Sequence, residues 1–513
     1  MHLPMWLLFY CLFLALLTAC GGTPPAKLPL TPPKQILKIP NVGIADSAPL
    51  DPALGADDNT SIIVNMIYSG LVRADKDLQV VPDQATWDVS PNNKVYTFHL
   101  KPHLTFSDGI PVTAQTYVYT LTRALLPVVK SQVAAFFEAN IVGQNDVSSG
   151  KTTTLKGVKA LNAQTLQITL VQPTPYFLVE LTNPIFFSVN PRFVSAYGQQ
   201  DWPNFVAGNG VGTGPFILKT WEHNVKMVFT PNPLYYGPAT KLAEVDMFFV
   251  NDAVTAYKSY RAGQYDMDWN ITPDDQQTAR SIPGFIREPQ LQTDILFFNT
   301  KISPFDTLEV RQAFAYATDK TMLAHTLFQD AVLPAPSILP PGMPGYQADY
   351  KGISFDQNTA RTLLQTAYPD ITTFPSVTFS YPSSLLSQNE ANFLQQMWQN
   401  TLGISVTLQS VEPTAYNDEL MKHQVQFGFT QWSADFPDPY DCLALHLLST
   451  ASTNYGQWSN SSFDDTVAQA EKSLGLVRIA LYNIAEQIAI EDVGWLPLDH
   501  QITAAIIPSY IHG

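Results

Sequence analysis

A strand, a helix and a second strand follow one another in the second half of the chain, and this order restricts the fold more than any other feature. Apolar residues alternate over 377–381 and again over 404–408, as in half-buried strands. Between them Ser387 and Glu390 predict the start of a helix, and Gly403 predicts its end. The expected inner face of this helix consists of Leu394, Met397, Trp398 and Thr401. Two strands joined in this way pair in parallel through a right-handed crossover, so the unit predicts an α/β sheet.

The same unit predicts where a ligand site lies. A further helix is expected after Pro413, followed by a strand over 425–429 that runs into the loop 431–439. This loop is rich in aromatic and acidic residues, with Trp432, Asp435 and Asp438 among them. Ligands of open α/β sheets gather outside the carboxyl ends of the strands, so the loop is the candidate site.

Two further stretches give definite expectations. A strand is predicted over 95–100, with a turn at Asp108-Gly109 and a helix from about Thr113. Later, Asp306 and Glu309 resemble a capping box at the start of a helix. The predicted core stripe of that helix consists of Val310, Ala313, Phe314 and Ala317.

The length and the charge limit the class of protein. A chain of 513 residues exceeds a single compact core, so two or three domains are expected. Acidic residues exceed basic ones by 44 to 28, which gives a formal net charge of −16. The sequence contains no basic stripe, so we expect no nucleic-acid partner and interpret the acidity as a solvated surface.

The first segment reads as a secretion signal. Residues 3–19 are almost unbroken apolar sequence, yet they fall short of the about 20 residues that a spanning helix needs. The segment closes on Leu-Thr-Ala-Cys-Gly-Gly, which resembles the bacterial lipobox and predicts lipidation of Cys20. The region before the segment departs from the usual pattern, because it holds His2 but no Lys or Arg. A buried N-terminal helix is the alternative interpretation.

These features predict that the chain begins with a signal peptide at 1–19, followed by a Pro-rich linker at 20–35. Of the three cysteines, Cys11 leaves with the signal and Cys20 is acylated, which leaves Cys442 alone. The mature chain is therefore expected to have no internal disulfide, and Cys442 is expected to be a small buried apolar residue.

Several segments, in this order, resemble the family-5 extracytoplasmic solute-binding proteins, the oligopeptide- and dipeptide-binding proteins of ABC importers. The most specific is Tyr-Thr-Phe-His-Leu at 96–100 together with Phe-Ser-Asp-Gly-Ile-Pro-Val-Thr-Ala at 106–114. The others are 50–52 (LDP), 68–71 (YSGL), 212–216 (GTGPF), 232–237 (NPLYYG), 298–300 (FNT), 310–313 (VRQA) and 494–498 (GWLPL). The resemblance thus runs nearly from end to end.

The resemblance implies an α/β, two-lobed periplasmic-binding-protein-like clamp with an extra subdomain in the first lobe. Lobe 1 is expected at 36–290, with the extra subdomain at about 72–205, and is completed by 488–513. Lobe 2 is expected at 291–487. The implied function is that of a substrate-binding lipoprotein that captures peptides between the lobes and delivers them to ABC transporter permease subunits. The resemblance also implies that the protein is an extracytoplasmic monomer and that a lipid anchors it to the cell membrane.

The resemblance also implies the site residues. In peptide-binding relatives the Asp of a Trp-x-x-Asp stretch pairs with the α-ammonium of the ligand, and here the stretch is Trp432-Ser433-Ala434-Asp435. An ammonium in a closed cleft needs such a carboxylate, because an unpaired buried charge costs several kcal/mol. Backbone groups around Trp432 and Ser433, and near Asp58, would pair with the main chain of the ligand.

Aromatic walls complete the expected pocket, with Trp432, Tyr440 and Trp458 as candidates. For Asp435 and Asp438 the alternative is a turn-capping role, which we favour for Asp438 because Pro439 follows it.

Other functions remain open from the residues alone. The sequence has no Gly-x-Ser-x-Gly, no His-Glu-x-x-His and no Cys pair at metal spacing, so we expect no enzyme, no metal and no cofactor. His99 and His103 are expected at the surface, and the glycines at 208–214 lack the Lys-Ser/Thr of a phosphate loop. The family also includes carriers of nickel chelates, haem, oligosaccharides and glutathione. A hydrolase, and a receptor or adhesin that feeds no transporter, are the remaining alternatives.

Overall fold

The computed structural model describes residues 35–512 except 55–56, 132–133 and 135–140, and from Ile36 onward the chain forms one compact unit. The predicted signal peptide, Cys20 and the linker up to residue 34 lie outside the described residues. None of the helices in the described part has both the length and the apolar character that crossing a membrane requires.

A six-stranded mixed sheet contains the strand–helix–strand unit, with the order β12-β16-β11-β15-β13-β14. Its strands are β11 (Phe285–Phe298), β12 (Val332–Pro334), β13 (Val377–Pro382), β14 (Val406–Val411), β15 (Phe427–Ser433) and β16 (Leu496–Ile506). Strand β13 pairs in parallel with both β14 and β15, which confirms the predicted parallel pairing. Strand β11 runs antiparallel to both β15 and β16.

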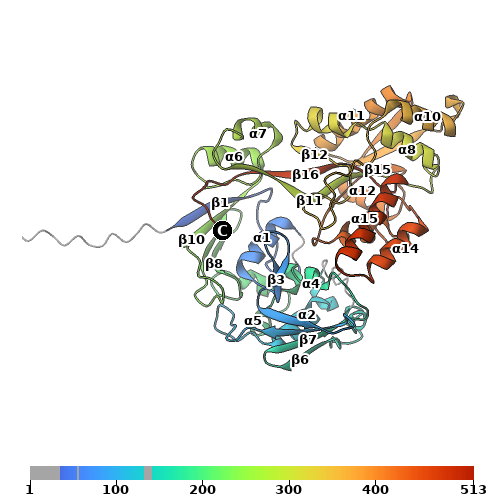
Figure 1. The fold of residues 1–513 in the computed structure, drawn as a ribbon. Coiled ribbons are helices and arrows are strands. Elements are labelled where there is room, and N and C mark those ends of the chain that lie inside the picture. The colour runs from blue at the N-terminus through green and yellow to red at the C-terminus, as the bar shows by residue number, and fades with distance from the viewer. Residues whose placement is uncertain (1–34, 55–56, 132–133, 135–140, 513) are drawn as a thin grey trace, which may run out of the picture. The chain divides into compact units, whose positions relative to one another are not determined.

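The helices of the second half pack around this sheet (Figure 1). They are α8 (Leu308–Tyr316), α9 (Lys320–Met322), α10 (Gln357–Ala367), α11 (Leu385–Leu402), α12 (Pro413–Met421), α13 (Leu445–Leu447), α14 (Ser461–Ala470) and α15 (Gly475–Glu491). The predicted inner face of α11 is buried, and Gly403 ends the helix at φ 72° as expected.

Two helix starts were predicted at the wrong residues. Helix α11 begins earlier than expected, because Ser384 is its N-cap and accepts a hydrogen bond from the Ser387 backbone N–H (3.0 Å). Glu390 is therefore an interior residue of the helix and is only 7% exposed. Helix α8 has Thr307 as its N-cap without a side-chain cap bond, so the expected Asp306–Glu309 capping box does not form. The predicted core stripe of α8 and the adjoining Ala317 are nevertheless fully buried.

The first half of the chain builds two four-stranded sheets and a hairpin, in the orders β1-β10-β9-β8, β4-β5-β7-β6 and β2-β3. The strands are β1 (Ile36–Val42), β2 (Val72–Ala74), β3 (Val80–Pro82), β4 (Ala85–Val89), β5 (Val95–Leu100), β6 (Val158–Asn162), β7 (Thr165–Thr169), β8 (Phe216–Glu222), β9 (Lys226–Pro231) and β10 (Glu244–Val250). The helices are α1 (Asp58–Ile67), α2 (Ala114–Ala124), α3 (Gln144–Ser148), α4 (Phe177–Glu180), α5 (Pro191–Tyr197), α6 (Ala253–Arg261) and α7 (Pro273–Ala279).

The elements predicted for the first half are confirmed. Strand β5 spans the predicted residues, Gly109 has the positive φ (86°) of a turn, and Thr113 caps α2. The glycines at 208–214 also have a packing explanation. A Cβ on Gly212 would lie 1.7 Å from the Ile67 carbonyl oxygen, so no larger residue fits there.

Separate hydrophobic cores belong to the two halves, and two strands pass from one core to the other. Leu296 on β11 and Leu498 on β16 lie in the large core of the second half. Farther along the same strands, Phe285 and Ile506 pack in a small cluster with Tyr257 of α6. The pairing of β11 with β16 is irregular between these regions, where the register shifts between residues 289 and 293. Figure 1 shows both strands running side by side from α6 and α7 toward β15 and α12. The fold is thus the expected two-lobed α/β architecture.

Candidate functional site

The predicted binding loop continues strand β15. Phe427, Gly428 and Phe429 build the inner part of this strand, and Gly428 lets the backbone approach the carbonyl oxygen of Ser380, which a Cβ would meet at 2.5 Å. At its end Trp432 and Ser433 are still paired with β11. Strand β13 pairs with β15 only at Phe427 and Gly428, so at the point where the loop leaves, the strand is held by β11 alone.

Asp441 holds this loop from behind. Its carboxylate accepts the Trp432 indole N–H (2.5 Å) and the backbone N–H of Asp435 (3.2 Å). Asp441 is fully buried, and burial together with the neighbouring Asp435 carboxylate raises its pKa well above the usual value. Asp441 thereby connects the Trp and the Asp of the Trp-x-x-Asp stretch. The sequence analysis missed it, although a carboxylate between Tyr440 and the apolar run 442–445 was a visible sign of a buried polar role.

Asp438 has the structural role that the sequence favoured. Its side chain accepts the backbone N–H of Tyr440 (2.9 Å), as in a capped turn. It also receives two hydrogen bonds from the guanidinium of Arg478 on α15, at 2.6 and 2.7 Å. Both side chains are less than a tenth exposed. This buried ion pair fastens the loop to helix α15 and leaves Asp438 no free face for a ligand.

Tyr440 makes a contact that sequence analysis did not predict. Its ring stacks on that of Tyr176, with 4.2 Å between the centroids and 22° between the planes. Tyr176 also stacks on Phe436, at 5.7 Å. Tyr176 immediately precedes α4, within the range expected for the extra subdomain. The loop of the second half therefore touches the first half through an aromatic stack.

A cavity of about 330 Å³ lies beside Trp432. It is lined by Asp294, Pro382, Leu386, Ser387, Glu390, Pro413, Tyr416, Asn417, Leu420, Phe429, Thr430, Gln431, Trp432, His446, Tyr455 and Trp495. The His446 ring lies 3.9 Å from the Trp432 ring and 5.3 Å from that of Trp495. Burial lowers the pKa of His446 to about 3, so this histidine is neutral. The cavity wall combines aromatic rings with two carboxyl groups.

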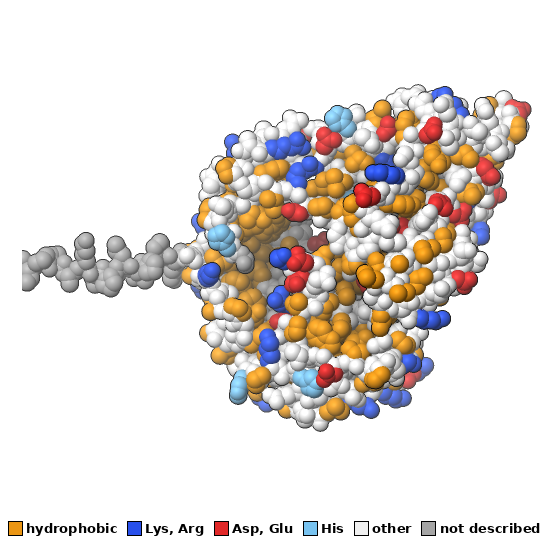
Figure 2. All heavy atoms as spheres, viewed as in Figure 1, with side chains coloured by type: hydrophobic (Ala, Val, Ile, Leu, Met, Phe, Trp, Pro, Cys, Tyr) orange, Lys and Arg blue, Asp and Glu red, His pale blue; other side chains and the backbone are white. Residues whose placement is uncertain are grey.

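Asp58 lies at a second cavity of about 840 Å³. Asp58 is in the first turn of α1 and is exposed, while Asp57 before it caps the helix. Residues 269–273 and 501–504 line the other walls. Leu386 of α11 lines both this cavity and the one beside Trp432. Figure 2 shows that the molecule is hollowed below β11 and β16, and that apolar, acidic and basic side chains surround the hollow.

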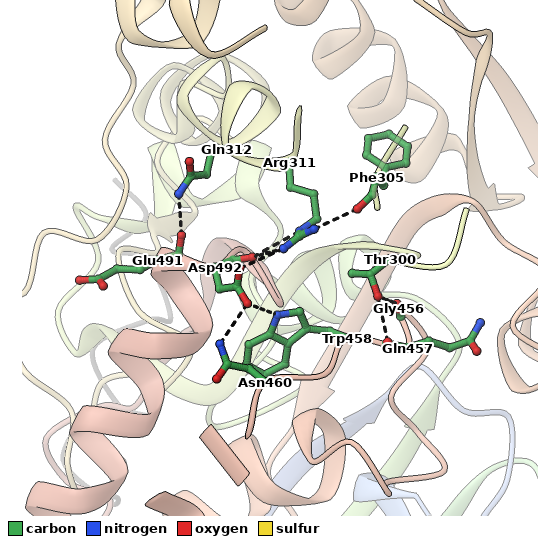
Figure 3. A network of polar contacts seen from close by, with 10 residues as sticks. All are labelled: Thr300, Phe305, Arg311, Gln312, Gly456, Gln457, Trp458, Asn460, Glu491 and Asp492. Atoms are coloured by element: carbon green, nitrogen blue, oxygen red, sulfur yellow. Dashed lines mark hydrogen bonds and ion pairs between the residues drawn. The ribbon is translucent and has the colours of Figure 1, made fainter. Parts of the chain in front are cut away.

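Trp458 is not a wall of either cavity. It is 2% exposed and belongs to the core of the second half. Its indole N–H donates to Asp492 (2.8 Å), which also pairs with Arg311 (3.1 Å) as Figure 3 shows. Asn460 donates to the same carboxylate oxygen (3.2 Å). The role of Trp458 is therefore structural and not that of the expected pocket wall, because the ring packs inside the core and its indole N–H has an internal partner.

The other side chains singled out in the sequence have ordinary places. His99 contacts Asp88 (2.9 Å) at the surface, and Cys442 is a free, buried cysteine as predicted. Within the described ranges, no three or more His, Cys, Asp or Glu side chains are grouped so that they could hold a metal ion.

Comparison with known proteins identifies relatives across nearly the whole chain. Residues 79–454 match the family model described as "Bacterial extracellular solute-binding proteins, family 5 Middle". The chain is 30% identical to the probable deoxycholate-binding periplasmic protein YgiS of Escherichia coli, over 95% of this chain and 92% of that protein. It is 28% identical to the oligopeptide-binding protein OppA of Bacillus subtilis, over 88% and 85% of the two chains.

A solved structure agrees with these sequence matches. The periplasmic murein tripeptide-binding protein MppA in its unliganded open form superposes with a TM-score of 0.82 at 30% identity, over 94% of both chains. By sequence, MppA of Escherichia coli is 30% identical over 91% of this chain and 88% of its own length.

Proposed function

The chain belongs to the family-5 bacterial extracellular solute-binding proteins, and we propose that it binds peptides and delivers them to the membrane permease of an ABC importer. Relatives named for oligopeptide and murein peptide binding support this ligand class. In this proposal the protein performs no chemistry on the peptide. It acts as a monomer in the extracytoplasmic space.

The observation that carries the proposal is the loop Trp432–Asp435, which Asp441 holds in place. The raised pKa of Asp441 reflects repulsion from the Asp435 carboxylate as well as burial. A peptide ammonium beside Asp435 would relieve this repulsion and form a charge-assisted hydrogen bond. The backbone at Trp432 and Ser433 would then pair with the peptide main chain, and Ala434, Tyr440 and the region of Asp58 would contact the ligand.

Blocking the amino terminus of the peptide tests this proposal. We expect a tripeptide with a free amino group to bind in isothermal titration calorimetry and its N-acetylated form to bind at least about tenfold more weakly, because acetylation removes the cation. The amidated peptide with a free amino group serves as the matched control. Equal binding of the free and the acetylated forms would remove Asp435 from the proposed role.

A second ligand class follows from the similarity to YgiS, whose name states deoxycholate binding. Deoxycholate is an anion, however, and the cavity beside Trp432 carries the carboxyl groups of Asp294 and Glu390. A steroid carboxylate would find no cation there and would oppose ionisation of these carboxyl groups, whereas a cationic group of a peptide would favour it, so we favour a peptide over the steroid. Deoxycholate belongs in the same titration as a competitor.

We propose that each lobe is built around the hydrophobic cores of one half of the chain. Residues 36–290 form the first lobe, and residues 291–487 form the main part of the second lobe. The sequence analysis expected the segment that completes the first lobe to begin at residue 488. We propose a later return to the first lobe, near residues 499–503, because Leu496 and Leu498 lie in the large core of the second half. The irregular pairing of β11 with β16 is the proposed hinge.

We propose that Cys20 carries the lipid anchor after removal of the signal peptide, since two or more acyl chains hold a protein on a membrane without a spanning helix. Expressed in a bacterial host, the wild-type chain should incorporate labelled fatty acid and remain with the membrane fraction. Cys20→Ser should lose the label and leave that fraction, whereas Cys442→Ser should behave as wild type. A labelled Cys20→Ser chain would refute the assignment.

A further inference from the structure

Three carboxyl groups meet next to the cavity beside Trp432. Asp294 on β11 and Asp499 on β16 are direct partners across the two antiparallel strands. The side-chain amide of Gln501 donates to both of them, at 2.9 Å each. Glu390 of α11 faces the same cavity as Asp294. The strands and the helix thus bring together three acidic residues that are between 96 and 205 positions apart in the chain.

The hydrogen-bonding capacity of this cluster is only partly used. Glu390 is 7% exposed and Asp499 1% exposed. Among the described residues, Glu390 Oε1 and Asp499 Oδ2 have no hydrogen-bond partner. Buried carboxyl oxygens are normally satisfied, so the unpartnered oxygen of Glu390, a residue that lines the cavity, indicates a missing donor. Because Glu390 lines the cavity, its carboxyl group would meet that donor.

No positive charge inside the described part of the protein compensates the cluster. None of the ion pairs formed by the described Lys, Arg and His side chains involves Asp294, Glu390 or Asp499. His500, next to Asp499, is neutral because burial lowers its pKa to about 3, and it contacts Thr293 instead (2.9 Å). Without a countercharge the buried carboxyl groups favour their protonated form, and a bound cation would offset the cost of ionising them.

The rest of the cavity suits the stem of a long basic side chain. Aromatic rings of Trp432, Tyr416, Tyr455 and Trp495 line it and offer apolar area and cation–π contact. Its volume of about 330 Å³ lies near the lower end of the roughly 300–1,000 Å³ typical of ligand pockets. A metal ion fits less well, because no group of metal-ligating side chains is found among the described residues.

We propose that this cavity is a subsite for a basic side chain of the bound peptide, in which an ammonium or guanidinium group contacts the carboxyl groups of Glu390 and Asp294. This inference rests on the proposed function, since the subsite adjoins the strand end that is proposed to bind the peptide backbone. Asp499 acts through Asp294 and Gln501 as a positioning residue. The protein therefore prefers peptides that contain lysine or arginine.

Binding at the subsite is coupled to proton release. Burial and the nearby Asp294 carboxylate raise the pKa of Glu390 to about 8, and burial raises the pKa of Asp294 and Asp499 as well. The other titratable groups that line the cavity are His446, Tyr416 and Tyr455; the first is neutral, and burial raises the pKa of both tyrosines. A bound cation favours the ionised carboxyls, so a proton leaves at neutral pH and affinity rises as the pH approaches about 8.

Pairs of peptides that differ by one charge test the subsite. The wild-type protein is titrated by calorimetry with alanine tripeptides that carry lysine or its uncharged analogue norleucine at each position in turn. We expect lysine to bind at least about tenfold more tightly than norleucine at one position, because only lysine supplies the cation. At that position the preference should grow between about pH 6 and about pH 8. The measured heat should also depend on the ionisation enthalpy of the buffer.

Two variants assign the preference to the cluster. In Glu390→Gln the ratio of lysine to norleucine affinity should fall toward one, and Asp294→Asn gives a second, independent measurement. Asp418→Asn on α12 removes the same charge from a side chain that is 72% exposed, and it should keep the wild-type ratio. Thermal unfolding of each variant verifies that it is folded.

The outcomes separate the subsite from the proposed function. If both peptides bind without a lysine preference at any position, or if Glu390→Gln keeps the full preference, the subsite is refuted while peptide binding stands. If neither peptide binds, the proposed function itself fails. If a glutamate peptide binds better than the lysine peptide, the charge argument is wrong.

Discussion

Asp435→Ala is expected to raise the Kd for a tripeptide with a free amino group by roughly a hundredfold, or about 3 kcal/mol. The reason is that the variant leaves the peptide ammonium in a confined site without the carboxylate that would pair with it. The backbone groups that are proposed to bind the peptide main chain remain in place. Calorimetric titration at neutral pH measures the effect. The variant should fold normally, because Asp441 still accepts the hydrogen bonds that hold the loop, from the Trp432 indole and from the backbone N–H of residue 435.

Two controls distinguish a charge effect from a loss of shape. Asp435→Asn keeps the volume of the side chain and should lose most of the same affinity. The N-acetylated peptide should bind Asp435→Ala and the wild type about equally, because it has no cation for Asp435 to bind. An unchanged Kd in Asp435→Ala, or an equal loss for both peptides, would contradict the proposed pairing.

The local pattern of the sequence was sufficient for many of the elements. Strands β5 and β13, the Gly403 helix end and the parallel pairing around α11 follow from periodicity and turn chemistry, which act over a few residues. The helix starts were less certain, because several Ser, Thr, Asp and Glu residues near each start can serve as caps. Ser384 rather than Ser387 caps α11, so Glu390 is inside the helix and its role in the cavity was hidden.

The candidate site was proposed from the sequence only along its own loop. The Trp-x-x-Asp spacing made Trp432 and Asp435 the candidates, and the structure adds the partners that position these two residues. Tyr176 and Arg478 approach the loop from other elements, which sequence separation conceals. Asp441 is close in sequence, but its contact with Trp432 depends on how the chain turns between them. These contacts follow from tertiary packing, for which a single sequence carries no periodic signal.

Arg478→Met is expected to lower the free energy of unfolding by about 3–5 kcal/mol, which makes it the largest stability effect that we predict. The substitution leaves the Asp438 carboxylate, which is 7% exposed, without the guanidinium that donates two hydrogen bonds to it. Removing one partner of a buried pair costs more than the pair contributes, because the remaining charge stays desolvated. Chemical denaturation measures the change, and Arg280→Met, at an exposed arginine of α7's C-terminal end, should shift it by less than about 0.5 kcal/mol.

The double variant Asp438→Asn/Arg478→Met tests whether the unpaired Asp438 carboxylate causes the loss of stability in Arg478→Met. With the charge removed from residue 438, most of the lost stability should return, since no uncompensated carboxylate remains. Because Asp438 belongs to the loop that also carries Asp435, the single variant should in addition weaken peptide binding, and the double variant should recover part of it. If Arg478→Met proves as stable as wild type, the ion pair does not fasten the loop. The position of Asp435 must then depend on Asp441 and the strand end alone.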